Sequence, residues 1–451
     1  MAQVTLTPDQ LSAVEIQGAY TTTDEQGNRV TIVLDDEPAE QDAGEPAGMV
    51  AEVAAVEHGD RVRVTLESGG SFEGTATEPA STEPTDHHHA EASFVFDGVD
   101  MDQISFGTDG WRATLDTFTD ERVRIVGQAV ADHLSAAGHD EPVAVGYDAR
   151  ETSEGFAESL AEVLAGNGFD VLLPERDAPT PVIAYAIVDR GLAGACMVTA
   201  SHNPPEYNGV KFIPHDGAPA LPDVTEDVVD RLAEPDLLPE AERGEIERVD
   251  LVSDHADAAR DLVGRVAAPG AGDALDLSGL TVAYDAMHGS GRGVTDALLE
   301  SAGAEVVRLR CERDVTFGGD SPEPSAEHLE ALAERVTDPD SDVDLGVAND
   351  GDADRIAVVT PERGVLDANL FYAACYDRLL ETDSGPAVRT VSTTFLVDRI
   401  AEAHGEEVYE TPVGFKWVAE AMGEHDALFG GEESGGFTLR GHVREKDGVL
   451  M

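Results

Sequence analysis

The chain has 451 residues and a strongly negative charge, since 29 Lys and Arg against 91 Asp and Glu give a formal net charge of −62. A field of that sign repels nucleic acid and anionic membranes, so neither is an expected partner. Hydrophobic residues make up 41% of the sequence, enough for packed cores, so the chain is not simply disordered. The acidic residues are spread along the chain. This predicts adaptation to very high salt, where screening reduces self-repulsion, and an ordinary acidic protein is the alternative.

The rare residue types narrow the picture further. Lysine occurs only three times, at Lys211, Lys416 and Lys446, so each is expected to do something that Arg cannot. The three cysteines have no CxxC spacing, which argues against a disulfide framework and a zinc site. No apolar run approaches the roughly 18 residues of a membrane span, and no signal peptide is recognisable, so we expect a cytoplasmic protein.

Residues 1–100 differ in texture from the rest. An alternating stretch over 29–36, and two stretches over 60–77 joined by Ser-Gly-Gly, predict a small β-rich, antiparallel unit over 1–77. Residues 35–48 and 78–100 are rich in Pro, acidic and small residues and are predicted to be linkers. Three adjacent histidines, His87–His89, could bind a metal. Adjacent positions in a linker do not build a closed site, so we interpret them as linker residues.

From Met101 onward, apolar stretches of strand length alternate with helical periodicity. Three blocks of this kind follow one another, with expected strands and helices at 141–150, 153–169, 170–174 and 194–201, then 280–291, 293–303 and 343–359, then 387–394, 395–405 and 426–437. We therefore expect an α/β protein with three consecutive α/β/α domains, each a mixed sheet covered by helices, over 101–250, 251–365 and 366–451. Their functional loops should lie at the carboxyl ends of strands.

The segment 199–205, TASHNPP, follows an apolar strand and presents Ser201 at its end. A serine hydroxyl in such a loop can carry a covalent group if acid/base and cationic partners converge on it. The alternative is a turn serine that bonds to the backbone.

A second strand is followed by Asp350, Asp352 and Asp354, with Arg355 closing the run. Three carboxylates at alternate positions suit a hard divalent cation and leave positions open for a phosphate oxygen, which favours Mg²⁺. An EF-hand is excluded because the sixth and twelfth positions are Arg355 and Pro361. A solvated acidic turn is the alternative in so acidic a chain.

Two glycine-flanked loops are weaker candidates. Residues 430–436, GGEESGG, would let backbone approach a ligand while Glu432 and Ser434 bond sugar hydroxyls, although a plain glycine-rich hairpin reads the same way. Residues 106–112, FGTDGWR, offer an arginine in a loop suited to phosphate.

Five motifs together carry a resemblance to a known family. FGTDGWR, TASHNPPEYNGVKF, DGDADR, VGFKW and GGEESGG occur in the order and spacing of the α-D-phosphohexomutases, the phosphoglucomutase/phosphomannomutase group. The resemblance covers residues 101–451. All three lysines fall in stretches that resemble motifs of this family, Lys446 in EKDG.

The resemblance implies a role for each matching residue. Ser201 resembles the phosphoserine that donates a phosphoryl group to one sugar oxygen and takes it back from another. Arg112, Lys211 and His202 resemble the catalytic groups beside it. The implied ligands of one Mg²⁺ are Ser201, Asp350, Asp352 and Asp354. The implied substrate-binding residues are Gly414, Phe415, Lys416, Glu432, Ser434 and Arg355.

The implied activity is the interconversion of hexose 1-phosphate and hexose 6-phosphate, with glucose as the best guess, through a hexose 1,6-bisphosphate that also acts as activator. Small-molecule sugar phosphates are the expected partners, and the sequence gives no indication of oligomeric state. Phosphomannomutase and phosphoglucosamine mutase are the alternatives within the family. A Mg²⁺ phosphatase that uses an Asp nucleophile is an alternative outside it.

Two departures from the family pattern affect these expectations. Some phosphomannomutase-type members have His where this chain has Gly436, and His442 is a candidate to replace it. The family also has a fourth domain with an R-x-S-G-T-E-P phosphate loop that this sequence lacks. We therefore expect domain IV to be absent and keep a truncated, inactive fragment as an alternative. Residues 1–100 are expected to be a fusion or an upstream misassignment of the start.

Overall fold

The computed structural model describes six strands within residues 1–100, at 3–6, 19–23, 29–34, 61–66, 71–77 and 92–96, and the ranges 101–107, 110–267 and 275–451. The chain divides into two compact units, Met1–Gln103 and Ile104–Met451. Among the described residues, no helix is long and apolar enough to cross a membrane.

The first unit contains one sheet, which confirms the predicted β-rich, antiparallel unit. Its strands are β1 (Gln3–Leu6), β2 (Ala19–Thr23), β3 (Arg29–Leu34), β4 (Arg61–Leu66), β5 (Ser71–Thr77) and β6 (Ala92–Phe96). They lie in the order β1-β6-β5-β4-β3-β2, and every pair is antiparallel. A short 3-10 helix, η1 (Met101–Gln103), ends the unit.

One strand of this unit corrects the sequence interpretation. β6 lies within 78–100, which we predicted to be a linker, and it pairs with both β1 and β5. Its sequence, ASFVF, is rich in the β-branched and aromatic residues that favour strands, but it directly follows a Pro-rich acidic stretch that dominated the composition. Residues 35–48 and His87–His89 lie outside the described residues.

The second unit begins with a six-stranded mixed sheet, which we call the first sheet. Its strands are β7 (Trp111–Thr114), β8 (Val143–Tyr147), β9 (Val171–Pro174), β10 (Gly194–Val198), β11 (Tyr207–Pro214) and β12 (Ile246–Val249), in the order β12-β9-β8-β10-β11-β7. Its helices are α2 (Asp120–Ala137), α3 (Ser153–Gly166), α4 (Thr180–Arg190), α5 (Pro222–Asp230) and the short η2 (Glu240–Glu242). β11 runs opposite to the other five strands of this sheet.

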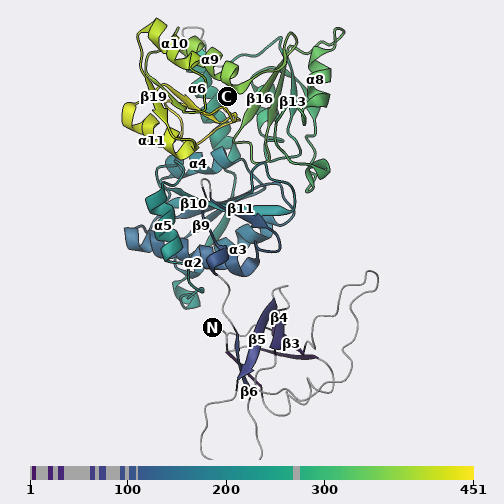
Figure 1. Ribbon diagram of the computed structural model, residues 1–451, viewed down its shortest axis with the longest axis vertical. Coiled ribbons are helices and arrows are strands. Elements are labelled where there is room, and N and C mark those ends of the chain that lie inside the picture. The colour runs from purple at the N-terminus through teal and green to yellow at the C-terminus, as the bar shows by residue number, and fades with distance from the viewer. Residues whose placement is uncertain are drawn as a thin grey trace, which may run out of the picture. The chain divides into compact units, whose positions relative to one another are not determined.

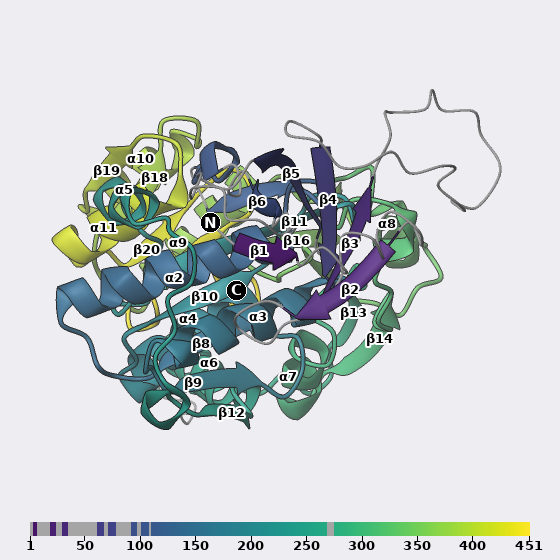
Figure 2. The same ribbon diagram turned by 90° about the horizontal axis from the view of Figure 1, so that it is seen from below.

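Helices cover both faces of the first sheet. In Figure 1, α4 lies on one face and α2 and α3 lie on the other; Figure 2 shows α2 and α3 from below. β8 and β10 are buried at every position, as expected for central strands covered on both sides. The predicted helix at 153–169 is confirmed: Leu160, Val163 and Leu164 are fully buried, and Phe156 is half-buried against the ring of Phe118.

A second mixed sheet follows in the chain. Its strands are β13 (Thr281–Asp285), β14 (Glu305–Leu309), β15 (Leu345–Asn349), β16 (Ile356–Thr360) and β17 (Gly364–Val365), in the order β14-β13-β15-β16-β17. Its helices are α6 (Val252–Ala267), α7 (Thr295–Ser301), the short η3 (Phe317–Gly319) and α8 (Glu330–Thr337). β13, β14 and β15 are parallel, and β16 and β17 add antiparallel pairs.

A third, four-stranded sheet completes the unit. Its strands are β18 (Ala387–Thr390), β19 (Val408–Thr411), β20 (Phe429–Gly431) and β21 (Phe437–Leu439), in the order β19-β18-β20-β21. Its helices are α9 (Ala368–Leu379), α10 (Leu396–His404) and α11 (Phe415–His425). Here too the last strand pairs antiparallel with its neighbour, while β18, β19 and β20 are parallel.

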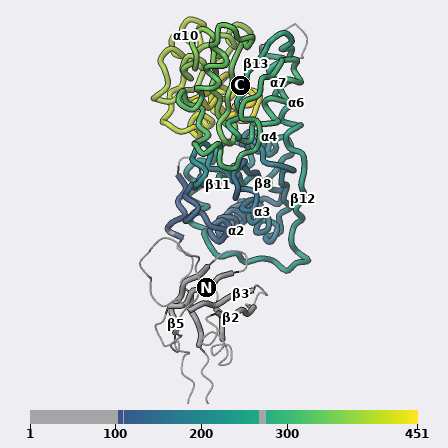
Figure 3. Tube along the Cα trace, turned by 90° about the vertical axis from the view of Figure 1, so that its right-hand side faces the viewer, coloured from purple at the N-terminus to yellow at the C-terminus, as the bar shows by residue number. Residues whose placement is uncertain are grey.

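The second and third sheets share one hydrophobic core. Buried residues of both contribute to it, including Tyr284 of β13, Tyr372 of α9 and Phe429 of β20. In Figures 1 and 3 the C-terminal end of the chain lies between these two sheets, and Val449 and Leu450 are buried in the shared core. The three predicted α/β domains, each with a mixed sheet and helices, are confirmed.

Candidate active site

Three of the four loops that the sequence singled out leave the carboxyl ends of β10, β15 and β20. Each of these strands is parallel to a neighbour on one side, and each loop leads into an antiparallel strand on the other side. The same connection thus recurs in all three sheets and brings one motif from each to the same region of the unit.

Ser201 lies in the first of these loops and is fully buried. Its backbone has φ 50°, the left-handed conformation that residues other than glycine rarely adopt. The N–H of Ser201 donates to the hydroxyl of Thr199 at 2.7 Å, and Thr199 donates in turn to Asp148. A buried residue held in this uncommon conformation presents its Oγ in a fixed direction.

Arg150 binds the backbone of the same loop, and the sequence analysis did not predict this role. Its guanidinium donates to the backbone carbonyls of Ser201 at 2.9 Å, Asn203 at 2.7 Å, Pro204 at 2.6 Å and Tyr207 at 3.1 Å. The side chain is only 1% exposed. One arginine therefore fixes the turn that carries the serine, because its planar fork can satisfy several carbonyls at once.

The carboxylates of Asp350, Asp352 and Asp354 are fully buried, and one ligand atom from each lies within 4.8 Å of the others. Ser201 Oγ donates to Asp350 Oδ2 at 3.0 Å, so the serine loop and the acidic loop meet. Burial and the negative charges of Asp354 and Asp352 raise the pKa of Asp350 well above its usual range. Asp352 Oδ1 and Asp354 Oδ1 are buried and accept no hydrogen bond. Crowded carboxylates with unused oxygens fit a hard divalent cation such as Mg²⁺.

The acidic loop is also held by the first sheet's helix α4. Thr180, the first residue of that helix, donates through Oγ1 to Asp352 Oδ2 at 2.7 Å and through its N–H to the carbonyl of Asp352 at 2.9 Å. Burial alone would raise the pKa of Asp352. The positive charge of Lys211, the Thr180 hydrogen bond and Lys446 outweigh burial and lower that pKa below its usual range. Asp352 is therefore an anion in the folded chain.

Two lysines reach the same carboxylates. Lys211 Nζ lies 3.3 Å from both Asp352 Oδ2 and Asp354 Oδ2. Lys446 Nζ lies 2.9 Å from Asp354 Oδ2, and the sequence reading did not include it among the site residues. The sequence offered two hints: Lys446 is one of only three lysines, and its EKDG stretch resembles a motif of the family.

Lys446 also fills the space beside Gly436, the position at which some phosphomannomutase-type members have His. A side-chain atom added at Gly436 would lie 2.5 Å from Lys446 Cδ, so the lysine occupies the space where a residue at 436 would project. His442, the candidate substitute, does not reach this space: its Nε2 lies 2.7 Å from Asp447 Oδ2 instead. The expectation for His442 is therefore corrected, because the chain between 436 and 446 turns His442 toward Asp447.

Two further predicted residues flank Ser201. His202 Nδ1 lies 3.3 Å from Ser201 Oγ, and Arg112 donates to Asn203 of the same loop at 3.3 Å. Burial, together with the positive charges of Arg355 and Arg112, lowers the pKa of His202 to about 4. His202 is therefore neutral near pH 7 and can accept a proton.

The third loop is tied to the VGFKW motif through Glu432. Its Oε1 accepts the N–H of Gly414 at 3.0 Å, and Lys446 Nζ lies 5.9 Å from the ring of Phe415. Burial raises the pKa of Glu432, while the positive charge of Lys446 opposes this rise. Gly414, Phe415 and Glu432 thus form one cluster with Lys446.

Ser434 and Lys416 have surroundings of their own. Ser434 is exposed and lines a hollow of about 250 Å³ together with Arg355. The backbone N–H of Arg355 donates to Asp350 Oδ1 at 3.1 Å and so closes the acidic loop on itself. Lys416 is half-buried with its Nζ 5.8 Å from the ring of Trp417. The structure thus brings together most of the predicted site residues and leaves these two at its margin.

Comparison with known proteins agrees with this geometry. Three family models match the second unit: Phosphoglucomutase/phosphomannomutase, alpha/beta/alpha domain I over residues 103–238, domain II over 263–364 and domain III over 367–451. A phosphoglucomutase/phosphomannomutase of Thermococcus kodakarensis is 32% identical over 351 residues, which is 76% of this chain and 75% of that protein. A phosphoglucosamine mutase of Desulforamulus reducens is 32% identical and covers 76% of both chains.

A solved structure points the same way. The crystal structure of a Thermus thermophilus protein assigned as a phosphomannomutase superposes with a TM-score of 0.68 at 34% identity, over 77% of this chain and 78% of that one. Matched domain models, relatives above 30% identity and the site geometry lead to one conclusion: the chain belongs to the phosphoglucomutase/phosphomannomutase family, the α-D-phosphohexomutases, and is an isomerase of that type.

Proposed function

We propose that this chain interconverts hexose 1-phosphate and hexose 6-phosphate through a phosphoserine at Ser201 and a hexose 1,6-bisphosphate. The observation that carries the proposal is the 3.0 Å distance between Ser201 Oγ and Asp350 Oδ2, which joins a buried nucleophile to the carboxylate triad. A serine in that position can hold a phosphoryl group, and a cation held by the three carboxylates would supply the charge that balances it.

Ser201, Asp350, Asp352 and Asp354 would hold one Mg²⁺, which when bound neutralises charge on the transferring phosphoryl group. Two positively charged side chains of the chain itself would stabilise the remaining negative charge. Lys211, between Asp352 and Asp354, and Arg112, beside Asn203, flank the serine loop and stabilise the negative charge that develops there.

The proposed transfer balances as follows. The bond from phosphorus to Ser201 Oγ breaks as a bond from phosphorus to the sugar O6 forms, and the O6 proton leaves to a base. Ser201 Oγ takes up a proton as it is released. The proton lost from O6 and the proton taken up by Ser201 Oγ balance, and neutral His202, whose Nδ1 lies 3.3 Å from Ser201 Oγ, can accept a hydrogen bond from the released hydroxyl. The reverse sequence on the sugar O1 then restores the phosphoserine.

Glucose is the proposed sugar, with mannose and glucosamine as the family alternatives. The GEESGG loop supports glucose because it resembles the phosphoglucomutase-type members. Glu432 is held by Gly414 N–H, and Ser434 lies at the open hollow beside Arg355. Both side chains offer groups that can bond sugar hydroxyls. The bisphosphate must bind in two orientations, so the hydroxyls that both orientations present are the ones the site should recognise.

Phosphoryl uptake tests the proposal. We expect the chain, incubated with glucose 1,6-bisphosphate and Mg²⁺, to gain one phosphoryl group that peptide mass spectrometry assigns to Ser201, and Ser201→Ala to gain none. His202→Gln serves as the matched control in the same loop and should still be labelled, at a lower rate. A label on an Asp of the 350–354 loop would contradict the proposal and favour a phosphatase.

A further inference from the structure

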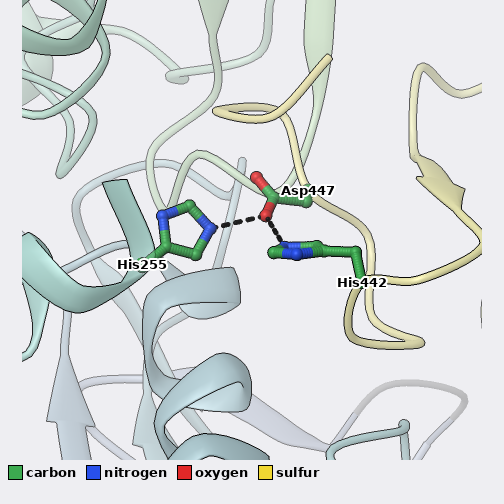
Figure 4. Close-up of side chains that lie close together, drawn as sticks. All are labelled: His255, His442 and Asp447. Carbon is green, nitrogen blue, oxygen red and sulfur yellow. Dashed lines mark hydrogen bonds and ion pairs between the residues drawn. The ribbon is translucent and has the colours of Figure 1, made fainter. Parts of the chain in front are cut away.

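A hydrogen-bonded group of three side chains lies outside the active site. His255 comes from α6, whereas His442 and Asp447 come from the segment after β21, so the group joins parts of the chain that are far apart in sequence (Figure 4). Asp447 Oδ2 lies 2.6 Å from His255 Nε2 and 2.7 Å from His442 Nε2. All three side chains are buried: His442 is 2% exposed, and the other two are fully buried. We call this group the His–Asp–His clamp.

The second oxygen of Asp447 is also fully used. Oδ1 accepts the N–H groups of Val449 at 2.9 Å and Leu450 at 2.8 Å, and the N–H of Asp447 donates to the carbonyl of Phe437. Burial opposes the charge on Asp447. The two histidines outweigh burial and hold the pKa of Asp447 well below its usual range. Asp447 is therefore an anion that accepts four hydrogen bonds and fixes the turn around it.

The contacts describe a hydrogen-bonded clamp better than a metal centre. Both nitrogen–oxygen distances are hydrogen-bond lengths, and His255 Nδ1 is buried without a hydrogen-bond partner. A metal-bound imidazole usually donates its second N–H to a neighbouring group. Tyr185 of α4 packs against both rings instead, stacked on His442 at 5.6 Å and edge-on to His255 at 5.7 Å.

The residues on either side of Asp447 reach the active site. Lys446 Nζ lies 2.9 Å from Asp354 Oδ2, and the carbonyl of Gly448 accepts Asn349 Nδ2 at 2.9 Å. Asn349 is the residue directly before the acidic loop. The segment 446–448 therefore connects the clamp to the acidic loop, and a shift of Asp447 moves Lys446.

We propose that His255 and His442 are positioning residues that act through Asp447 to hold Lys446 against Asp354 in the active site. The two histidines connect α6, and through Tyr185 also α4, to the segment after β21. The position of Lys446 therefore depends on the packing of these elements. The consequence for turnover rests on the proposed mutase function, whereas the consequence for the place of Lys446 does not.

The scarcity of lysine allows a direct test of the place of Lys446. A chain labelled with ¹³Cε-lysine has three lysine side-chain signals, since the sequence holds only Lys211, Lys416 and Lys446. Lys446→Met and Lys416→Met assign two of them. We expect His255→Leu and His442→Leu each to shift or broaden the Lys446 signal and to leave the Lys416 signal in place. His255→Gln and His442→Gln, which keep a donor, should restore part of the wild-type position.

A matched control separates this effect from general loss of packing. His133 makes the same kind of contact, with Nδ1 2.7 Å from Asp227 Oδ2 between α2 and α5, far in sequence from Lys446. His133→Leu is expected to leave all three lysine signals unchanged. If a leucine variant does not fold, Asp447→Asn replaces it. We expect this variant also to shift or broaden the Lys446 signal, because asparagine keeps the volume of aspartate but has one acceptor oxygen fewer. An unmoved Lys446 signal in both leucine variants overturns the proposal.

Kinetics supply the second readout. We expect His442→Leu to lower kcat about tenfold with KM within about twofold, and to cost almost nothing further in a Lys446→Met background. Equal losses of kcat in both backgrounds would mean that the histidine acts independently of Lys446 and would overturn the proposal. A wild-type chain without turnover would refute the mutase function, and the lysine spectra would still decide the question of position.

Discussion

Two of the three lysines of this chain contact one carboxylate, Asp354, at 3.3 Å and 2.9 Å. A compact ammonium with three donors can approach a crowded anion from different sides, whereas the planar guanidinium of Arg needs room for its fork. This explains why lysine persists at 211 and 446 in a chain whose other cations are nearly all arginine.

At the residue scale, Glu121 on α2 gives a prediction for stability against pH. Its Oε1 is buried without a hydrogen-bond partner. Burial, with the negative charges of Glu234 and Asp120, raises its pKa from 4.5 to about 7. Between these two values the folded chain keeps a proton that the unfolded chain has lost, so the free energy of unfolding falls as pH rises.

Glu121→Gln removes that dependence. We expect the variant to match the wild type near pH 4 and to be more stable by about 1.5 kcal/mol at pH 8, a value reduced because solvent screens a half-buried side chain. Urea unfolding at both pH values measures this. Glu420→Gln, exposed on α11, is the control and should change stability by less than about 0.5 kcal/mol at either pH. A Glu121→Gln variant no more stable than wild type at pH 8 would refute the argument.

At the element scale, the serine loop and the acidic loop approach each other backbone to backbone. A Cβ added at Gly351, between Asp350 and Asp352, would lie 2.6 Å from the carbonyl oxygen of Ser201. The atom that the added Cβ meets belongs to the backbone of Ser201 and cannot move aside as a flexible side chain could. A side chain at 351 must therefore push the two loops apart. The distance that carries the proposed chemistry, from Ser201 Oγ to Asp350, would then lengthen.

Gly351→Ala is therefore expected to lower kcat about 100-fold, because misplacement by about 1 Å can cost that much. Its free energy of unfolding should change far less than its activity. Gly155→Ala on α3 is the matched control: the added carbon meets no atom within 4 Å, so activity should be unchanged and stability should rise by about 0.5 to 1 kcal/mol. Wild-type kcat in Gly351→Ala would show that the two loops need not touch.

Most of the elements could be predicted because their signals are local. The alternation and length of stretches such as 143–147 and 194–198 indicate buried strands, and the loops after them hold the motifs. Arg150, Thr180 and Lys446 could not be predicted in the same way. Each reaches its partner across a long sequence separation, and nothing in its local sequence records that distance. β6 was missed for a different reason, since a short strand beside a Pro-rich acidic stretch has little local signal.

At the scale of the whole molecule, the site exists only where the sheets meet. A buried ion pair between Arg292 and Asp177, at 2.6 Å, joins the second sheet's loops to the first. The second and third sheets share a core, and Ile356 N–H donates to the carbonyl of Gly435 at 2.9 Å. The serine loop, the acidic loop and the 430–436 loop thus keep their places through contacts between sheets, so the site belongs to the assembled unit.

The net charge of −62 acts at the same scale. Self-repulsion of that size weakens the compact state at low ionic strength, and salt reduces it over short distances. Adaptation to high salt stays a prediction, and it sets the conditions in which activity should be measured.

The central claim is tested most directly by following glucose 1-phosphate with ³¹P NMR in the presence of this chain, multimolar KCl, Mg²⁺ and a trace of glucose 1,6-bisphosphate. We predict conversion to glucose 6-phosphate that stops when the bisphosphate is omitted from dephosphorylated enzyme and is abolished in Ser201→Ala. Release of inorganic phosphate in place of the 6-phosphate, or undiminished turnover in Ser201→Ala, would contradict the account.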